Sequence, residues 1–146
     1  MKYVTVITAF LLITSCVNQG SEKKTGKEEE IIHKAQSEVV TLDNGEKWKA
    51  NFATTKGIMN MKYLVETINE KSNIDDYRKL SENLQKEFQH IFQRCDMTGE
   101  AHNQLHSYLH PMSEWFKTLK EGDMDECRSA VASLNEHLEK YDSYFK

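Results

Sequence analysis

Residues 123–145, D-M-D-E-C-R-S-A-V-A-S-L-N-E-H-L-E-K-Y-D-S-Y-F, decide the fold of this chain. Apolar side chains recur in this stretch at alternating steps of three and four residues: Met124, Cys127, Val131, Leu134, Leu138, Tyr141 and Phe145. Because an α-helix has about 3.6 residues per turn, this spacing forms one stripe on a helix of more than about five turns. Such a stripe predicts a helix that packs against other helices.

Three runs with the same spacing precede it. They cover residues 54–71, then residues 75–95, then a run from Ala101 to Leu119 that Gly122 stops. The candidate N-caps are Thr54 or Thr55 for the first run, Asp75 or Asp76 for the second, and Asp123 for the last. Four amphipathic helices with short connections predict an all-α fold, an antiparallel four-helix bundle.

Pro111 is the only proline in the 146 residues, and it lies inside the third run. Proline removes one backbone hydrogen bond from a helix and collides with the preceding turn. We therefore expect a kink or a break at this position. If the helix stops at His110, the bundle keeps a shorter third helix.

The segment before the first helix contains a turn signal, Asp43-Asn44-Gly45. Trp48 and Phe52 follow it with charged residues between them. We interpret residues 46–53 as an arm that lies across the bundle, with Trp48 as an aromatic plug at the edge of the core. The folded domain is thus expected to cover residues 42–146.

The first fifteen residues have the pattern of a signal peptide. A basic start, Met1-Lys2-Tyr3, is followed by the apolar run Val4–Ile13 and then by Ser15 and Cys16. A cysteine at this place resembles the lipobox of bacterial lipoproteins, which predicts a lipidated Cys16. The alternative is an ordinary secretory signal in which the cysteine is accidental.

In the lipoprotein interpretation, residues 16–41 are the lipidated cysteine and a polar linker, and the chain's partner there is the membrane. No aspartate follows Cys16 directly, which favours the outer membrane with the domain in the periplasm, while exposure at the cell surface stays open. The formal net charge of −4 argues against a nucleic-acid partner.

The stretch from Cys95 to Met112 concentrates the side chains that bind metals. It holds one thiol, two thioethers and three imidazoles in C-D-M-T-G-E-A-H-N-Q-L-H-S-Y-L-H-P-M. His102, His106 and His110 are four residues apart, so neighbouring pairs can share a helix face. At 100° per residue, His102 falls at the border of the core, His106 further round and His110 close to the outward face.

The sulfur atoms decide which metal these histidines would suit. Cys95 lies at the end of the second apolar stripe, and Met97 lies in a polar connection that offers a methionine no core to fill. Thiolate, thioether and imidazole together favour Cu(I), and Cys95 with His102 and His106 alone would suit Zn(II). Cys127 starts the last helix at the opposite end of an antiparallel bundle, so we do not expect it to form a disulfide with Cys95.

The two motifs together resemble a family of small envelope lipoproteins from Bacteroidetes. The arm L-D-N-G-E-K-W-K-A-N and the stretch C-D-M-T-G-E-A-H-N-Q-L-H-S-Y-L-H-P are similar to that family's C-x-M-x-G-E-A-H-x-x-L-H-x-x-L-H-P pattern. The resemblance covers about residues 42–120. It implies a helical bundle, an envelope location and a grouping of five residues, namely Cys95, Met97, His102, His106 and His110.

Three functions compete on these observations. The first is a lipid-anchored metal-binding protein that sequesters or transfers copper, or zinc. The second is electron transfer with haem b, because Met61 and His137 match the axial ligands of four-helix b-type cytochromes by analogy of fold, although His137 lies about a quarter-turn off its stripe. The third is a module that binds another envelope protein. We do not expect an enzyme, because no orienting group or oxyanion site accompanies Cys95 and His102.

Overall fold

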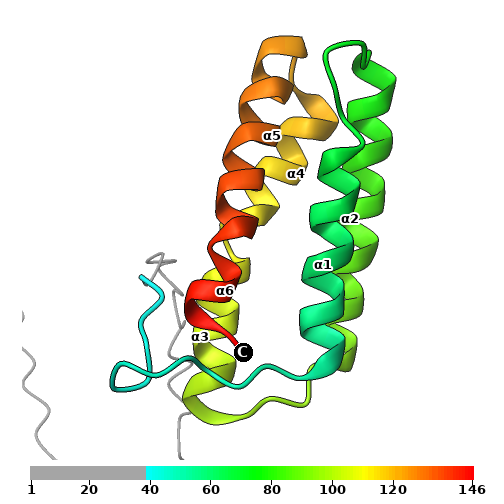
Figure 1. The fold of residues 1–146 in the computed structure, drawn as a ribbon. Coiled ribbons are helices and arrows are strands. Elements are labelled where there is room, and N and C mark those ends of the chain that lie inside the picture. Colours follow the sequence, from blue (N-terminus) through cyan, green and yellow to red (C-terminus); the bar gives the residue numbers. More distant parts are fainter. Residues whose placement is uncertain (1–38) are drawn as a thin grey trace, which may run out of the picture. The chain divides into compact units, whose positions relative to one another are not determined.

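The computed structural model describes residues 39–146. The expected signal peptide, Cys16 and most of the expected linker lie outside the described residues. Six helical segments follow one another along the described part of the chain: α1 (Phe52–Glu66), α2 (Ile74–Arg94), α3 (Gly99–Leu109), α4 (Met112–Glu121), α5 (Met124–Glu139) and α6 (Tyr141–Tyr144) (Figure 1).

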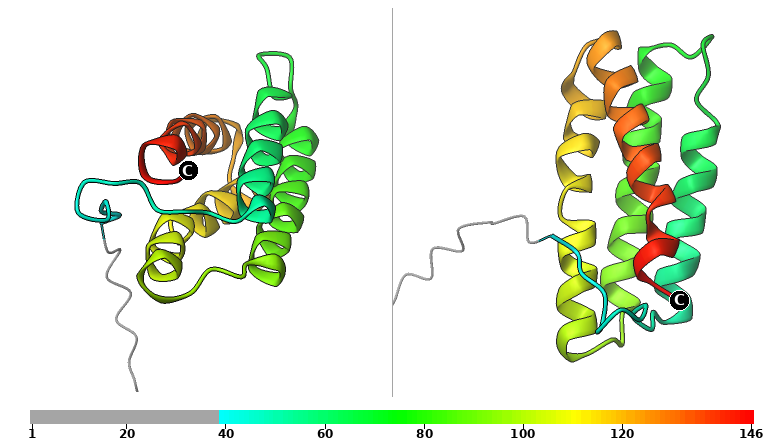
Figure 2. Two further views of the ribbon diagram at one scale, coloured as in Figure 1. Left: turned by 60° about the horizontal axis from the view of Figure 1, so that its bottom comes forward. Right: turned by 60° about the vertical axis from the view of Figure 1, so that its left-hand side comes forward.

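These segments form the predicted four-helix bundle. α1 packs against α2 and α5, while α4 packs against α2 and α5. The third side of the bundle consists of α3 followed by α4, and the fourth side of α5 followed by α6 (Figure 2). The start of α1, the end of α2, the start of α3 and the C-terminus lie at one end of the bundle, which we call the C-terminal pole (Figure 1).

The first two helices begin and end at other residues than the sequence predicts. α1 is capped by Asn51, whose side chain accepts a hydrogen bond from the backbone N–H of Thr54 at 2.9 Å, and not by Thr54 or Thr55. It ends at Glu66, well before the predicted end at residue 71. The cap of α2 is Asn73, while Asp75 and Asp76 lie in its first turn. Asparagine and aspartate are about equally favourable as N-cap residues. The residue types therefore do not decide which of the neighbouring candidates caps the helix.

Pro111 breaks the third run. Of the two outcomes expected from the sequence, a kink or a break, the structure shows the break. α3 ends at Leu109 and α4 begins at Met112, with His110 and Pro111 in right-handed helical backbone between them. His110 still donates its N–H to the carbonyl of His106 at 2.9 Å, but Pro111 has no N–H to continue the ladder. The bundle keeps four sides because the chain becomes helical again at once, as α4.

The fourth run begins as predicted and ends earlier. Asp123 caps α5 in a reciprocal arrangement with Glu126. The single long helix expected up to Phe145 instead stops at Glu139, and the short α6 follows. At this interruption the hydroxyl of Tyr108 of α3 donates to the carbonyl of His137 at 2.9 Å. The N–H of Lys140 bonds that same carbonyl in a tighter turn.

The predicted arm is present and pairs with the C-terminus. Asn44 and Gly45, with φ of 50° and 93°, form the tight turn. The backbone N–H of Trp48 donates to the carbonyl of Tyr144, and the Trp48 carbonyl accepts from the N–H of Lys146, both at 2.8 Å. Its half-buried ring packs against the core, which confirms the aromatic plug. The arm ends at Asn51 and not at residue 53, because α1 begins at Phe52.

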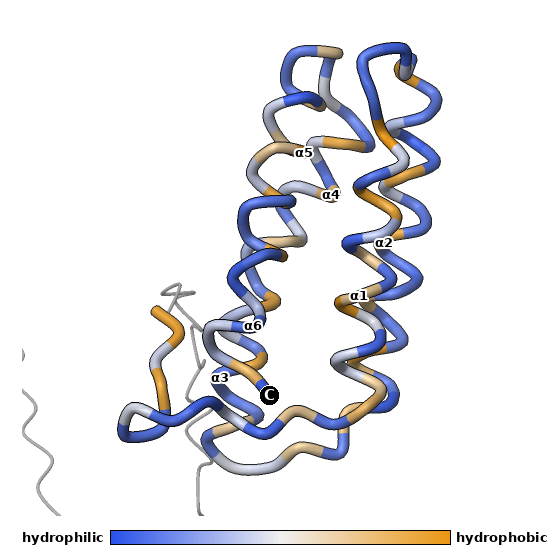
Figure 3. The backbone as a smooth tube through the Cα atoms, in the orientation of Figure 1, coloured by the Kyte–Doolittle hydropathy of each residue, from blue (hydrophilic) through white to orange (hydrophobic). Residues whose placement is uncertain are grey.

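Apolar residues recur among hydrophilic ones along every long helix (Figure 3). Fully enclosed side chains include Ile58, Leu84, Leu105, Leu134 and Leu138, one or two from each side of the bundle. No helix in the described part of the chain is long and apolar enough to cross a membrane.

Polar side chains of α2 tie it to α4. Arg78 donates to the carbonyls of Leu119 and Gly122 at 2.6 and 2.7 Å, at the end of α4, where carbonyls lack helical partners. Ser81 donates to the carbonyl of Phe116 at 2.7 Å. These bonds fix the register in which α2 and α4 pack.

Gly57 sets how closely α1 approaches α2. A Cβ atom at this position would lie 2.5 Å from Cγ1 and 2.9 Å from Cδ1 of Ile91. We predict that Gly57→Ala lowers the free energy of unfolding, since overpacking costs about 1–3 kcal/mol and the better helix propensity of alanine offsets only about 1 kcal/mol. Urea unfolding followed by circular dichroism measures the change.

The control is a double-mutant cycle with Ile91→Ala, which removes both Cγ1 and Cδ1 from the crowded contact. The loss in the double variant should be smaller than the sum of the two single losses. A Gly57→Ala protein more stable than the original chain would contradict the close contact.

Candidate metal centre

The candidate metal ligands surround the connection between α2 and α3. Cys95 is the C-cap of α2, with extended backbone, and so directs the chain out of the helix. Gly99 begins α3 with a φ of 62°, in the left-handed region that glycine adopts most easily. The chain therefore turns back at Gly99, as the sequence predicts, and brings the first turns of α3 next to the end of α2.

This turn brings the Cys95 thiol and the His102 imidazole together. The Cys95 Sγ and His102 Nδ1 atoms are 3.6 Å apart, and both side chains are half-buried. A zinc ion has bonds of about 2.3 Å to sulfur and about 2.0 Å to nitrogen in a tetrahedral site, so two such ligands lie about 3.6 Å apart. The pair thus has the separation of two ligands of one ion, although a hydrogen bond also accounts for it.

His106 lies one turn further along α3 and continues the row. Its ring centroid is 4.4 Å from that of His102 and 5.0 Å from that of Phe92 on α2. Partial burial, and then the charge of His102, lower the pKa of His106 below its ordinary value of 6.5. A lowered pKa keeps the imidazole neutral near pH 7, and only the neutral form binds a metal.

The other two predicted ligands occupy different surroundings. His110 is exposed at the break before Pro111, as its place on the outward face predicts. Met97 is half-buried and packs against the hydrophobic core. The expectation that Met97 has no core to fill is therefore wrong, because the connection folds back over the C-terminal pole and gives the thioether apolar neighbours.

Among residues 39–146, no three side chains drawn from histidine, cysteine, aspartate and glutamate form a group that could hold a metal ion. The pair of Cys95 and His102, with the adjacent ring of His106, is the part of the predicted set that the structure brings together.

The second cysteine of the described chain has a different environment. Cys127 is fully buried at the start of α5, at the pole opposite Cys95, and both thiols are free, which confirms that they do not pair. Its Sγ lies 3.6 to 3.8 Å from the carbonyls of Thr118, Leu119 and Gly122. Burial raises the pKa of Cys127 despite the nearby Arg78 guanidinium.

The two residues of the haem alternative lie within the packed bundle. Met61 is completely buried in the core. The His137 Nε2 atom is 2.7 Å from the carbonyl oxygen of Tyr108, and its ring stacks on the Tyr108 ring with centroids 4.4 Å apart. Because a carbonyl only accepts hydrogen bonds, Nε2 carries the proton, and Nδ1 is the nitrogen with a free lone pair.

Sequence reasoning missed the cluster of aromatic residues around His137. Tyr108 and His137 exchange two hydrogen bonds, each from a side chain to the other residue's carbonyl. The rings of Tyr141 and Phe145 lie 5.6 and 5.7 Å from Tyr108. Tyr108 and Phe145 both fall on predicted stripes, but the spacing does not show which residue of the facing helix each one meets.

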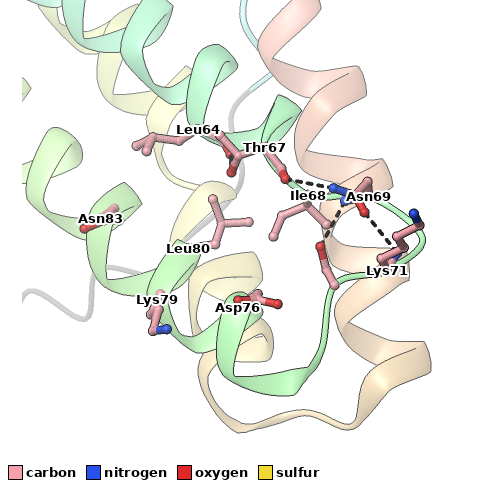
Figure 4. A pocket seen from close by; sticks show the side chains of 10 residues that line it. Leu64, Thr67, Ile68, Asn69, Lys71, Asp76, Lys79, Leu80 and Asn83 are labelled. Atoms are coloured by element: carbon pink, nitrogen blue, oxygen red, sulfur yellow. Dashed lines mark hydrogen bonds between the residues drawn. The ribbon is translucent and has the colours of Figure 1, made fainter.

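A cavity of about 480 Å³ lies away from these residues, beside the connection from α1 to α2 (Figure 4). Some of its polar groups bond one another. Asn69 accepts from the N–H of Lys71 at 2.9 Å, and its own N–H donates to Ser72 at 3.0 Å. These bonds hold the turn in place.

Comparison of the chain with protein-family models, with curated proteins and with solved structures gives no match in any of the three. The chemistry of the site therefore rests on the residues described above.

Burial makes His137 a source of acid sensitivity. Desolvation lowers its pKa below 6.5, more than the hydrogen bond to Tyr108 raises it. As the pH falls through 6.5 the unfolded chain binds a proton that the folded chain does not, so the free energy of unfolding decreases. We predict a lower melting temperature at pH 5 than at pH 7.5, with part of the decrease absent in His137→Gln, whose amide still donates to Tyr108.

The matched control is His110→Gln, which changes an exposed histidine between α3 and α4. Its melting temperature should fall between the two pH values as much as that of the original chain. An equal fall in His137→Gln would mean that His137 does not cause the acid sensitivity.

Proposed function

We propose that this chain binds a soft metal ion at the C-terminal pole of the bundle, and that the preferred ion is copper(I). Cys95 and His102 are the primary ligands, and His106 and Met97 are the candidates to complete the set. His110 is a further candidate, through the resemblance that groups it with them.

One observation carries the proposal: the 3.6 Å separation of Cys95 Sγ and His102 Nδ1. The two atoms come from different helices, so the fold of the connection determines their distance. Both are half-buried, which leaves room for an ion to reach them while limiting competition from water.

The remaining residues favour copper(I) over zinc. Thiolate and thioether sulfur are soft ligands that select Cu(I). Zinc prefers four protein ligands in a structural site, and Cys95, His102 and His106 alone would leave one of the four positions open. A copper(I) site with two or three ligands suits the residues that lie close together.

The location belongs to the same proposal. The pattern from Met1 to Cys16 supports lipid anchoring in the envelope. An anchored domain with one accessible thiolate and imidazole pair would sequester copper there or pass it to another protein. The sequence gives no support for an enzymatic step.

The test is a titration of copper(I) into the reduced chain carrying Cys16→Ser, in competition with a chromophoric copper(I) chelator. We expect one ion per chain, and a loss of affinity of at least about tenfold in Cys95→Ser and in His102→Ala, because even the loss of a residue that only orients a ligand costs about 10–100-fold. Below about pH 6 the affinity should decrease, because protons compete for the imidazoles and the thiol.

The matched control is His90→Ala, which removes an exposed histidine from α2 near the same pole. Its affinity for copper(I) should equal that of the chain that carries only Cys16→Ser. Binding that survives the combined Cys95→Ser and His102→Ala change, or the absence of stoichiometric binding before any change, would refute the proposed site.

A further inference from the structure

A second surface of the bundle has the features of a small-molecule site. A groove of about 580 Å³ lies between α2 and α4, within the range of about 300–1,000 Å³ that ligand sites occupy. Each helix contributes residues three and four apart, so the groove follows two neighbouring helix faces. Its end at Phe92 adjoins His106 of the candidate metal centre, but the inference does not depend on the proposed function.

Three phenylalanines form the apolar part of the groove. The rings of Phe88 and Phe116 meet edge to face at 5.4 Å, and Phe92 continues the row at 4.9 Å from Phe88. Phe116 is buried and Phe88 half-buried, but 40% of Phe92 is exposed. An aromatic side chain exposed beside two packed ones leaves apolar surface that a ligand could cover.

The rim of the groove is positively charged at one end. Lys117 and Lys120 line it from α4 together with Glu121, which gives these three residues a net charge of +1. Neither lysine forms an ion pair within residues 39–146. The α2 side of the rim consists of glutamine amides, which carry no charge.

The register of the two helices gives the groove a direction. Ser81 of α2 bonds the Phe116 carbonyl of α4, and α2 and α4 run in opposite directions. The lysines therefore lie toward the start of α2, while Phe92 lies near its end, next to His106. An elongated ligand would meet ammonium groups at one end and aromatic rings at the other.

We infer that this groove binds a single-chain anionic amphiphile, such as a medium-chain carboxylic acid. The carboxylate lies at Lys117 and Lys120, and the alkyl chain lies over Phe88 and Phe92. The charge of the rim selects an anion, and the length of the aromatic row selects an extended apolar chain.

The experiment uses the full-length chain carrying Cys16→Ser and dodecanoate, below the concentration at which it forms micelles. We expect saturable one-to-one binding, with amide chemical-shift changes in residues 85–93 and 113–121. Lys117→Gln combined with Lys120→Gln should weaken binding about tenfold, because each exposed ion pair contributes about two- to fivefold. Glu121→Gln should strengthen it, since it removes the only anion among the three charged rim residues.

Two controls keep the test specific. Lys71→Gln combined with Lys79→Gln makes the same change of charge beside the other cavity and should leave the affinity unchanged. Dodecyltrimethylammonium, with the same alkyl chain and a cationic head, should bind at least about tenfold more weakly than dodecanoate.

Either of two results would overturn the inference. One is shift changes that do not saturate or that persist at full strength in the double lysine variant. The other is shift changes at Phe92 that depend on protein concentration before dodecanoate is added, which would assign the groove to contact between two copies of the chain.

Discussion

Pro111 has no backbone N–H, and its ring would collide with the carbonyl of residue 107 in a continuous helix, so the third apolar run cannot form one straight rod. The chain responds with two helices, α3 and α4, and of these two it is α4 that packs extensively against α2. This division frees α3 to cover the C-terminal pole. His102 and His106 are on α3, and they meet Cys95 and Phe92 at the end of α2 because α3 is positioned there.

The pole that α3 covers is closed by aromatic rings. Tyr108 reaches from α3 to the carbonyl of His137, and Tyr141 and Phe145 pack around it. This carbonyl also accepts the N–H of Lys140 in the tighter turn that ends α5, and after α6 the chain extends at Phe145. The extended C-terminus then offers its backbone to the arm at Trp48. The break at Pro111, the Tyr108 hydroxyl and the arm at Trp48 thus all contribute to the packing at the C-terminal pole.

Apolar spacing predicts the four sides of the bundle because burial of one helix face is a local property of the sequence. Helix boundaries are harder, since Asn51 and Asn73 compete as caps with nearby threonines and aspartates, and small differences in energy decide between them. The misjudged surroundings of Met97 and the missed pair of Tyr108 and His137 have another cause. Both depend on which residues of distant segments face each other, and periodicity within one segment does not contain that information.

The two described cysteines show why the surroundings and not the residue type make a candidate ligand. Both continue apolar stripes, and both are free thiols. Cys127 is enclosed by three backbone carbonyls, whose negative ends oppose a thiolate, and burial raises its pKa. Cys95 has an imidazole nitrogen as its neighbour, which can share an ion with the sulfur. A cysteine metal site needs a sulfur that can lose its proton, a second ligand atom nearby and a path by which the ion arrives from solvent. Of these two cysteines, only the half-buried Cys95 has both the second ligand atom and access to solvent.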